Sequence, residues 1–272
     1  MNLYGMNVTR IAAIVIRQFY LMRGSMSRVI PLFAWVAVDI VLWGFLTRYL
    51  NAVTSSPFDF VPVLLGAVLL WDFFARVMHG VTMAFFEDVW SRNFLNMFAS
   101  PLSIGEYLSG LVLSSLATSL IGLVAMLAVA TLVFGWSILA YGTMAVPFLL
   151  VLFLFGIALG ILGSALVLRL GPSAEWFVWP IPAVVSPFAG VYYPVATLPV
   201  WMQWVARVLP PSYVFEGLRA IVEHRAWSPA TLLLGTGLAI VDVMLACVAF
   251  TRVYRHAVRT GLIARYSAET VS

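Results

Sequence analysis

Long apolar stretches recur from one end of the chain to the other, and short polar segments separate them. Six stretches approach the roughly 20 residues that a helix needs to cross a bilayer core: 29–47, 60–83, 107–134, 143–168, 176–195 and 232–250. Unpaired backbone groups are not tolerated in lipid, so each span is expected to be helical. The pattern predicts an all-α membrane protein with about six transmembrane helices, in a single domain over residues 1–272.

The fifth stretch is less regular than the others. Four prolines fall in it: Pro180, Pro182, Pro187 and Pro194. Proline removes a backbone donor and interrupts the hydrogen-bond ladder of a helix. A broken or re-entrant segment is therefore expected over 176–195.

Residues 7–28 have an amphipathic pattern. Arginines recur through them at Arg10, Arg17, Arg23 and Arg28. An apolar stripe at helical spacing comprises Ile11, Val15, Phe19 and Met22. The pattern predicts a helix that lies in the membrane interface, and an amphipathic helix packed on protein is the alternative. Arg17 interrupts the run early and no small-residue cleavage site follows, so we expect no removable signal peptide.

Two polar segments interrupt the apolar stretches. Residues 85–101 place apolar side chains on one helical stripe and charged ones on another, with Glu87, Asp88 and Arg92 among the charged positions. A short helix of this kind can dock into a soluble partner. Residues 186–221 mix prolines, aromatic residues and a helical tail, and they are too apolar for a free loop and too broken for a span.

Composition narrows the functional classes. The chain is 63% hydrophobic and 10% charged, whereas soluble domains are roughly 45–50% apolar and 25% charged. All fifteen basic residues are arginine, so a phosphate-binding-loop lysine is absent and no nucleotide site of that type is expected. The arginines lie at the ends of the predicted helices, as membrane topology requires, which argues against nucleic-acid binding. A lone Cys247 and scattered His79, His224 and His256 give no disulfide framework and no metal motif.

The distribution of arginines predicts the orientation. If both termini are cytoplasmic, ten arginines fall on the cytoplasmic side: Arg10, Arg17, Arg23, Arg28, Arg92, Arg169, Arg252, Arg255, Arg259 and Arg265. Four fall outside: Arg48, Arg207, Arg219 and Arg225. This excess fits the positive-inside rule with an even number of crossings. The prediction is a multi-pass protein of the inner (plasma) membrane whose tail, 252–272, is cytoplasmic.

The order and spacing of the two polar segments resemble those of the ABC-2 type exporter permeases. The first resembles the family's cytoplasmic coupling region, through a run of Leu95, Ser100, Pro101, Leu102, Ser103 and Glu106. The second resembles its outer-leaflet helical hairpin, at Ser186-Pro187, Gly190-Val191, Tyr193-Pro194, Leu198-Pro199, Trp201, Trp204, Leu209-Pro210, Tyr213, Glu216 and Leu218-Arg219. Arg92-Asn93-Phe94 departs from the family, where many members carry a Gly-Thr or similar pair.

This resemblance implies a non-enzymatic permease subunit. It also implies a dimer of permeases, with a homodimer favoured, that stands on two cytoplasmic ATPases. ATP and Mg²⁺ would bind to those partners and not to this chain. Glu87, Asp88 and Arg92 are then expected to face the ATPase, and membrane lipids surround the spans.

Four ionisable residues fall inside predicted spans, where charge is costly and indicates function by default: Asp39, Asp72, Arg76 and Asp242. Asp72 and Arg76 are four residues apart and therefore neighbours on a helix surface. We expect a structural ion pair, and a proton relay is the alternative. Gly156, Gly160, Gly163 and Ser164 are spaced as a close-packing face.

Aromatic residues gather in the fifth stretch and the hairpin. We interpret five of them as pathway or gate residues: Trp176, Trp179, Phe188, Tyr192 and Tyr193. An interfacial aromatic belt is the alternative. With no basic residue between Arg169 and Arg207, the segment suits an amphipathic cargo better than a small anion. A lipid-linked glycan or polysaccharide is favoured, then a drug or lipid. The rival functions are a proton-coupled secondary transporter that uses intramembrane Asp residues, and a membrane enzyme, for which we find no catalytic constellation.

Overall fold

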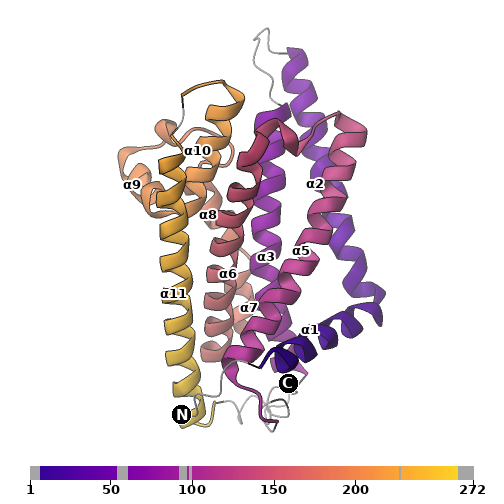
Figure 1. Ribbon diagram of the computed structural model, residues 1–272, viewed down its shortest axis with the longest axis vertical. Helices are drawn as coiled ribbons and strands as arrows, with labels where there is room; N and C mark the ends of the chain where they lie inside the picture. The colour runs from indigo at the N-terminus through magenta and orange to yellow at the C-terminus, as the bar shows by residue number, and fades with distance from the viewer. Residues whose placement is uncertain (1–6, 54–60, 92–96, 98–99, 227, 263–272) are drawn as a thin grey trace.

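The structure is helical throughout the part of the chain that it describes. The computed structural model describes residues 7–53, 61–91, 97, 100–226 and 228–262, and it contains no strand in these ranges (Figure 1). The prediction of an all-α protein is confirmed. Within the described residues, four helices are long and apolar enough to cross a membrane: Val63–Trp90, Ile104–Phe134, Ile138–Leu170 and Ala230–Arg259.

Four long helices form the bundle. Helix α3 (Gly66–Trp90) lies at its centre, between α5 (Ile104–Phe134) and α6 (Ala145–Leu170). Helix α11 (Pro229–Arg259) packs against the other side of α6 (Figure 1). The aromatic side chains on α3 before Trp90, from Trp71 to Phe86, are buried against its neighbours, so the core follows this helix. Because α11 continues to Arg259, the predicted tail of 252–272 begins inside a helix.

The contact between α3 and α6 depends on the predicted glycine face. A Cβ atom on Gly160 would lie 2.9 Å from the carbonyl oxygen of Met78, and one on Gly163 would lie 2.9 Å from the hydroxyl of Thr82. The Thr82 hydroxyl donates a hydrogen bond to the Gly160 carbonyl at 3.1 Å. Small residues thus bring the two backbones close together, as expected for helices that pack in lipid.

The amphipathic N-terminal segment forms α1 (Val8–Arg23), which crosses one end of the bundle obliquely and packs against α5 (Figure 1). The single helix predicted over 7–28 is wrong, because α1 ends at Gly24 and α2 (Met26–Val53) begins directly after it. Part of the predicted apolar stripe is buried and part of it is exposed. Its member Phe19 is 60% exposed, and the buried face comprises Ile11, Ile14 and Gln18.

The fifth stretch is broken, as its prolines predict. It forms α7 (Glu175–Val178) and α8 (Ile181–Ala189), with a turn before Pro180 and Gly190 in the left-handed region at the end of α8. Two further helices follow, α9 (Val200–Val208) and α10 (Pro210–Val222). Helix α9 lies on the outside of the molecule, whereas α10 packs against α11 and α6 (Figure 1). The six-span count and the re-entrant placement of 186–221 in a membrane stay predictions.

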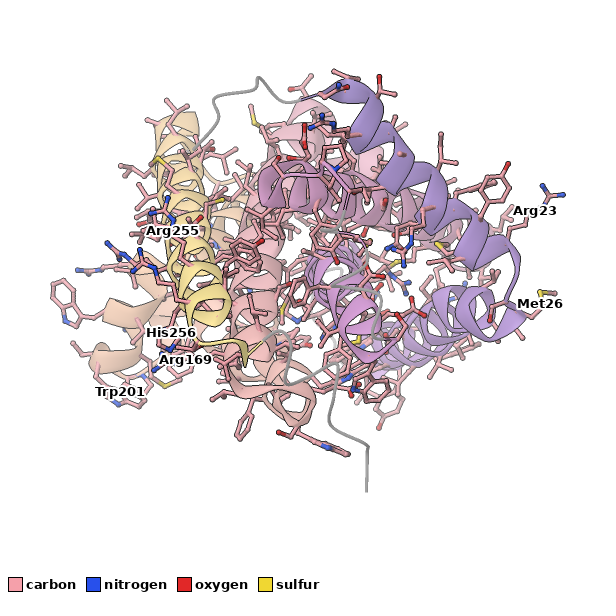
Figure 2. The ribbon with its side chains drawn as sticks, turned by 90° about the horizontal axis from the view of Figure 1, so that it is seen from below. Arg23, Met26, Arg169, Trp201, Arg255 and His256 are labelled. Atoms are coloured by element: carbon pink, nitrogen blue, oxygen red, sulfur yellow. The ribbon has the colours of Figure 1, made fainter. Side chains whose placement is uncertain are left out.

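The two ends of the bundle differ in basic charge. Among the arginine side chains that the structure describes, seven lie at the end that carries α1: Arg10, Arg17, Arg23, Arg169, Arg252, Arg255 and Arg259. Four lie toward the opposite end: Arg48, Arg207, Arg219 and Arg225. Figure 2 views the first end, with Arg23 and Arg255 on opposite sides of it. We call the first the arginine-rich end and the second the outer end.

Candidate functional site

An ion pair at the arginine-rich end joins three helices. The guanidinium of Arg17 on α1 forms two hydrogen bonds with the carboxylate of Asp88 on α3, one of them at 3.1 Å. The hydroxyl of Tyr107 on α5 donates to the same carboxylate at 2.8 Å. Asp88 and Tyr107 are fully buried. Burial alone would lower the pKa of Arg17, but the hydrogen bond and charge of Asp88 raise it above its usual value. The guanidinium of Arg17 therefore stays ionised.

A second contact joins α1 to the start of α5. Ser103 and Glu106 form a capping box there, in which the Ser103 hydroxyl accepts from the Glu106 backbone and the Glu106 carboxylate accepts from the Ser103 backbone. The same carboxylate accepts a hydrogen bond from the backbone of Asn7 at 2.9 Å and pairs with Arg10 at 3.4 Å. Arg10 and Arg17 are two turns apart on α1. Side chains at this spacing share a helix face, so both pairs hold the same face of α1.

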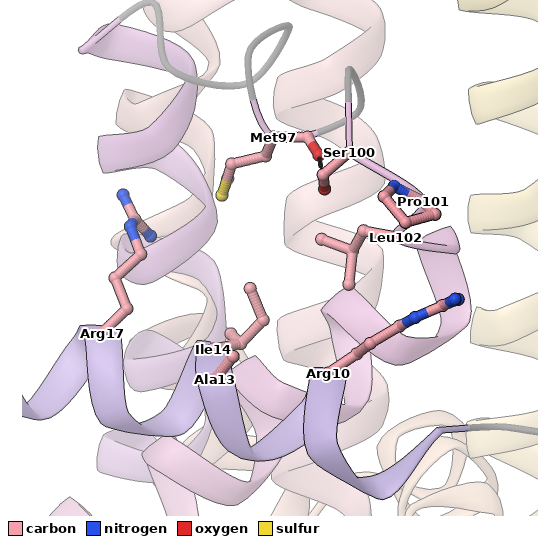
Figure 3. A pocket seen from close by; sticks show the side chains of 8 residues that line it. All are labelled: Arg10, Ala13, Ile14, Arg17, Met97, Ser100, Pro101 and Leu102. Atoms are coloured by element: carbon pink, nitrogen blue, oxygen red, sulfur yellow. Dashed lines mark hydrogen bonds between the residues drawn. The ribbon is translucent and has the colours of Figure 1, made fainter.

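A groove lies between α1 and the segment that leads into α5 (Figure 3). Its volume is about 310 Å³, and its lining residues are Arg10, Ala13, Ile14, Arg17, Met97, Ser100, Pro101 and Leu102. The Ser100 hydroxyl donates to the Met97 carbonyl at 2.5 Å and closes the turn before Pro101. The groove thus has an apolar lining with two arginines along it, both supplied by α1.

The predicted coupling residues do not share one surface. Phe85–Trp90 is the last part of α3, and the helix ends at Ser91. Asp88 therefore points into the chain, toward Arg17, and not outward as expected. Glu87 is half-buried and lines a different cavity, between α1, α3 and α5. Arg92, like most of the predicted helix beyond α3, lies outside the described residues.

The predicted pathway aromatics lie along α7, α8 and the turn after them. Trp176 is 83% exposed. The indole of Trp179 donates to Glu175 at 3.1 Å and contacts the ring of His79, with ring centres 4.7 Å apart. These positions begin a line of aromatic side chains that runs toward the outer end.

The remaining three aromatics make contacts near the outer end. Tyr192 stacks on Trp43 of α2, with ring centres 5.1 Å apart and planes at 8°. Phe188 meets Trp201 edge to face at 6.1 Å. Tyr193 donates its hydroxyl to the Pro187 carbonyl at 3.0 Å. The sequence did not reveal that α2 supplies the stacking partner.

Three of the four charges that the sequence predicts within the membrane are close together. Arg76 binds Asp72 at 2.5 Å along one face of α3, so the predicted ion pair is present. Asp39 on α2 interacts electrostatically with both of them. Asp242 lies on α11, on the far side of the bundle from α2 (Figure 1).

A buried arginine fixes the outer end. Arg219 on α10 donates to the carbonyls of Gly190 and Val191, just after α8, and binds Glu216 at 3.0 Å. Glu216 in turn accepts from the backbone of Val195 at 2.8 Å. Burial lowers the pKa of Arg219, but a guanidinium remains charged in any protein. In the sequence this arginine stands out only as part of the family resemblance, and no pattern there indicates its bonds to the backbone.

Comparison with models of protein families identifies the family of this chain. The family model of the ABC-2 type transporter matches residues 9–222, from the start of α1 to the end of α10. A search among curated proteins finds no match. The matched region covers most of the chain and contains the groove, both ion pairs and the outer-end arginine. The chain therefore belongs to the ABC-2 type transporter family, as a multi-pass, non-catalytic membrane permease subunit of the kind that pairs with ABC ATPases.

Proposed function

We propose that this chain forms half of an export pathway for an amphipathic cargo in the inner (plasma) membrane, with both termini in the cytoplasm. Two copies, as a homodimer, stand on two cytoplasmic ATPases that bind ATP and Mg²⁺. A lipid-linked glycan or polysaccharide is the favoured cargo, and a drug or lipid comes next. The excess of arginine at the end that carries α1 supports this orientation.

The observation that carries the proposal is the joint between α1, α3 and α5 at the arginine-rich end. Two ion pairs hold α1 on the ends of two long helices, and the groove beside them has an apolar lining with basic residues along it. A docked ATPase that moves α1 or the Met97–Leu102 segment acts directly on α3 and α5. Glu87 and Arg92 remain our candidates for direct contact with the ATPase. Asp88 is assigned instead to holding α1 in place.

The cargo proposal rests on the aromatic segment from α7 to Tyr193. Aromatic faces pack against apolar groups, while tyrosine hydroxyls and tryptophan N–H groups keep polar partners. Such a wall suits a cargo with a lipid part and a sugar part. The segment is also broken at its prolines, and broken helices are tolerated at membrane depth only beside protein or a water-lined cavity.

Reconstitution of the permease with its ATPase in proteoliposomes tests the cargo. We expect ATP-driven movement of lipid-linked oligosaccharides, and a lower rate in the Tyr192→Ala, Tyr193→Ala double variant. Leu234→Ala, at an exposed position of α11, is the matched control and should transport as wild type does. If the complex transports hydrophobic drugs but no oligosaccharides, the cargo is a drug or lipid and not a glycan. Transport driven by a proton gradient without the ATPase would overturn the proposal in favour of a secondary transporter.

Reversal of charge at Glu87 tests the contact with the ATPase. Glu87→Arg should abolish the stimulation of ATP hydrolysis by the permease while the variant still inserts and assembles. Glu223→Arg, at the outer end, should leave the stimulation unchanged. Unchanged stimulation in Glu87→Arg would remove Glu87 from the contact surface.

A further inference from the structure

A second cavity at the arginine-rich end has a different lining from the groove. Its volume is about 370 Å³, and α1, α3 and α5 form most of its wall, with Glu175 of α7 at one side. We call it the α1–α3–α5 crevice. Met22, Met83 and Trp90 supply much of its apolar wall. Ligand cavities typically have volumes of about 300–1,000 Å³ and a few polar groups within an apolar lining, so this one suits a small molecule or one group of a larger one.

A buried amide in this wall lacks a hydrogen-bond partner. Gln18 is only 7% exposed, and its side-chain nitrogen has no partner within the part of the chain that the structure describes. A buried donor left unpaired typically costs about 1–3 kcal/mol, so an occupant that accepts its hydrogen bond is favoured. The hydroxyls of Ser114, Ser115 and Thr118 are on the same wall, but they already donate to backbone carbonyls. Gln18 is therefore the donor that the crevice offers.

Two carboxylates are the acceptors that the crevice offers. Glu87 and Glu175 both line it; Glu87 also interacts electrostatically with Arg17, and Glu175 accepts the indole N–H of Trp179. An ionised carboxylate only accepts hydrogen bonds. A phosphate or another anion is repelled by these groups, and an ammonium ion satisfies them but has no acceptor for Gln18. A hydroxyl group donates to a carboxylate and accepts from an amide, so a polyhydroxyl compound satisfies both.

We propose that the α1–α3–α5 crevice binds a saccharide group. This inference rests on the proposed export of an amphipathic glycan and names the site where its sugar first binds. The carboxylates accept from sugar hydroxyls, the Gln18 amide donates to another, and the apolar ring face packs on Trp90 and the methionines. Glu175 connects the crevice to Trp179, where the proposed aromatic pathway begins. The crevice is thus an entry site that leads to that pathway.

Photolabelling tests the site without turnover. The nucleotide-free complex of permease and ATPase, in lipid nanodiscs, is irradiated with an alkyl β-glucoside that carries a diazirine in its chain. Two probes with the same chain bear a sulfate or a trimethylammonium head. Mass spectrometry should place glucoside label on peptides that contain Met22, Met83 or Trp90, with competition by unlabelled alkyl glucoside. The sulfate and ammonium probes should label these peptides weakly.

Two variants and a control sharpen the test. Gln18→Leu should reduce the glucoside label by about tenfold, as expected for the loss of one hydrogen bond from a buried donor. Glu175→Gln should also reduce it, while an amide oxygen still accepts from Trp179. Ser119→Ala is the control. It removes a buried hydroxyl that, like the Gln18 amide nitrogen, has no described partner, but Ser119 does not line the crevice, so this variant should be labelled as strongly as wild type. Equal labelling by all three heads, or full labelling of Gln18→Leu, would overturn the site.

This result is separable from the transport assay. Selective glucoside labelling that depends on Gln18 supports the site even if the ATPase-driven assay moves only drugs, and the failure then belongs to the proposed cargo. Glycan transport together with unselective labelling supports the proposed cargo and rejects the crevice as its entry site.

Discussion

Each end of the molecule is fixed by an arginine, but the two arginines hold different kinds of partner. Arg17 binds the side chains of Asp88 and, through it, Tyr107, and so links the surfaces of three helices. Arg219 binds backbone carbonyls at Gly190 and Val191 and fixes the course of the chain itself. An ion pair between helix surfaces separates when one helix moves as a rigid body. A bond to the backbone breaks only when the local chain conformation changes. We therefore expect α1 to move as a rigid body more readily than the outer end changes its conformation.

The largest decrease in the free energy of unfolding is expected when Asp88 is replaced. Asp88→Ala leaves Arg17, whose side chain is only 26% exposed, without its counterion and removes the acceptor of Tyr107. Breaking one partner of a buried pair typically costs about 3–5 kcal/mol, and the partial exposure of Arg17 puts this case at the low end. Equilibrium unfolding in mixed micelles measures this loss of stability. Glu223→Ala breaks an exposed pair with Arg225, for which about 0–1 kcal/mol is expected. Equal losses in the two variants would contradict a stabilising role for the buried pair.

The next effect concerns the outer end. Arg219→Lys keeps the charge but loses the planar fork that reaches two carbonyls and Glu216 together. Arg219→Lys therefore loses at least one hydrogen bond of a charged group, which typically contributes about 1.5–3 kcal/mol to the free energy of unfolding. Hydrogen exchange should rise at residues 190–195 and stay unchanged in α1. Arg207→Lys, where the guanidinium lies over Trp204 at an exposed position, is the control and should leave exchange at 190–195 unchanged. If Arg219→Lys increases exchange in α1 as strongly as at 190–195, the two ends are not independent.

A smaller effect on stability is expected at Asp72 and Arg76, which lie on α3 between the two ends of the bundle. Asp72→Ala and Arg76→Ala should each lower the melting temperature, because each removes one partner of an ion pair in an apolar span. The double variant should recover part of the loss, with a coupling of about 1 kcal/mol in a double-mutant cycle. Strict additivity, with transport lost only in the double variant, would indicate a functional pair and contradict the structural one.

The smallest effect tests the attachment of α1 to α5. Ser103→Ala removes the N-cap hydroxyl of the capping box and should cost about 1 kcal/mol. Chemical denaturation measures this loss. Ser228→Ala removes the N-cap hydroxyl of α11, where no reciprocal side-chain bond is described, and should cost less. A larger loss for Ser228→Ala would mean that the box adds nothing to the attachment.

The features that follow from the sequence are local ones. The apolar stretches predict the long helices because length and hydropathy suffice for a spanning helix. The spacing of Asp72 and Arg76 predicts their pair, and the spacing of Gly160 and Gly163 predicts a close helix contact. In each case the partners lie on one helix or along one face.

The features that do not follow from the sequence depend on contacts between distant segments. Asp88 and Arg17 are 71 residues apart, and no pattern in either segment indicates the other. Arg219 reaches carbonyl groups 28 and 29 residues earlier, and every residue offers such a group. The outward orientation predicted for Asp88 failed because it assumed a separate helix over 85–101, whereas α3 continues to Trp90. Residues 85–90 belong to α3, so the geometry of α3 sets the direction in which their side chains point.

Site-directed cross-linking tests the central claim, that the ATPase docks at the arginine-rich end, beside α1. The native cysteine is replaced by Cys247→Ser, and single cysteines are introduced as Ala13→Cys, in the lining of the groove, or Val200→Cys, at an exposed position of α9. A cleavable reagent that carries a maleimide for the introduced cysteine and an amine-reactive ester for lysines of the ATPase is then applied to the purified permease–ATPase complex. The account predicts a permease–ATPase product from Ala13→Cys and none from Val200→Cys. A product from Val200→Cys alone, or from neither position while the ATPase remains bound, would contradict it.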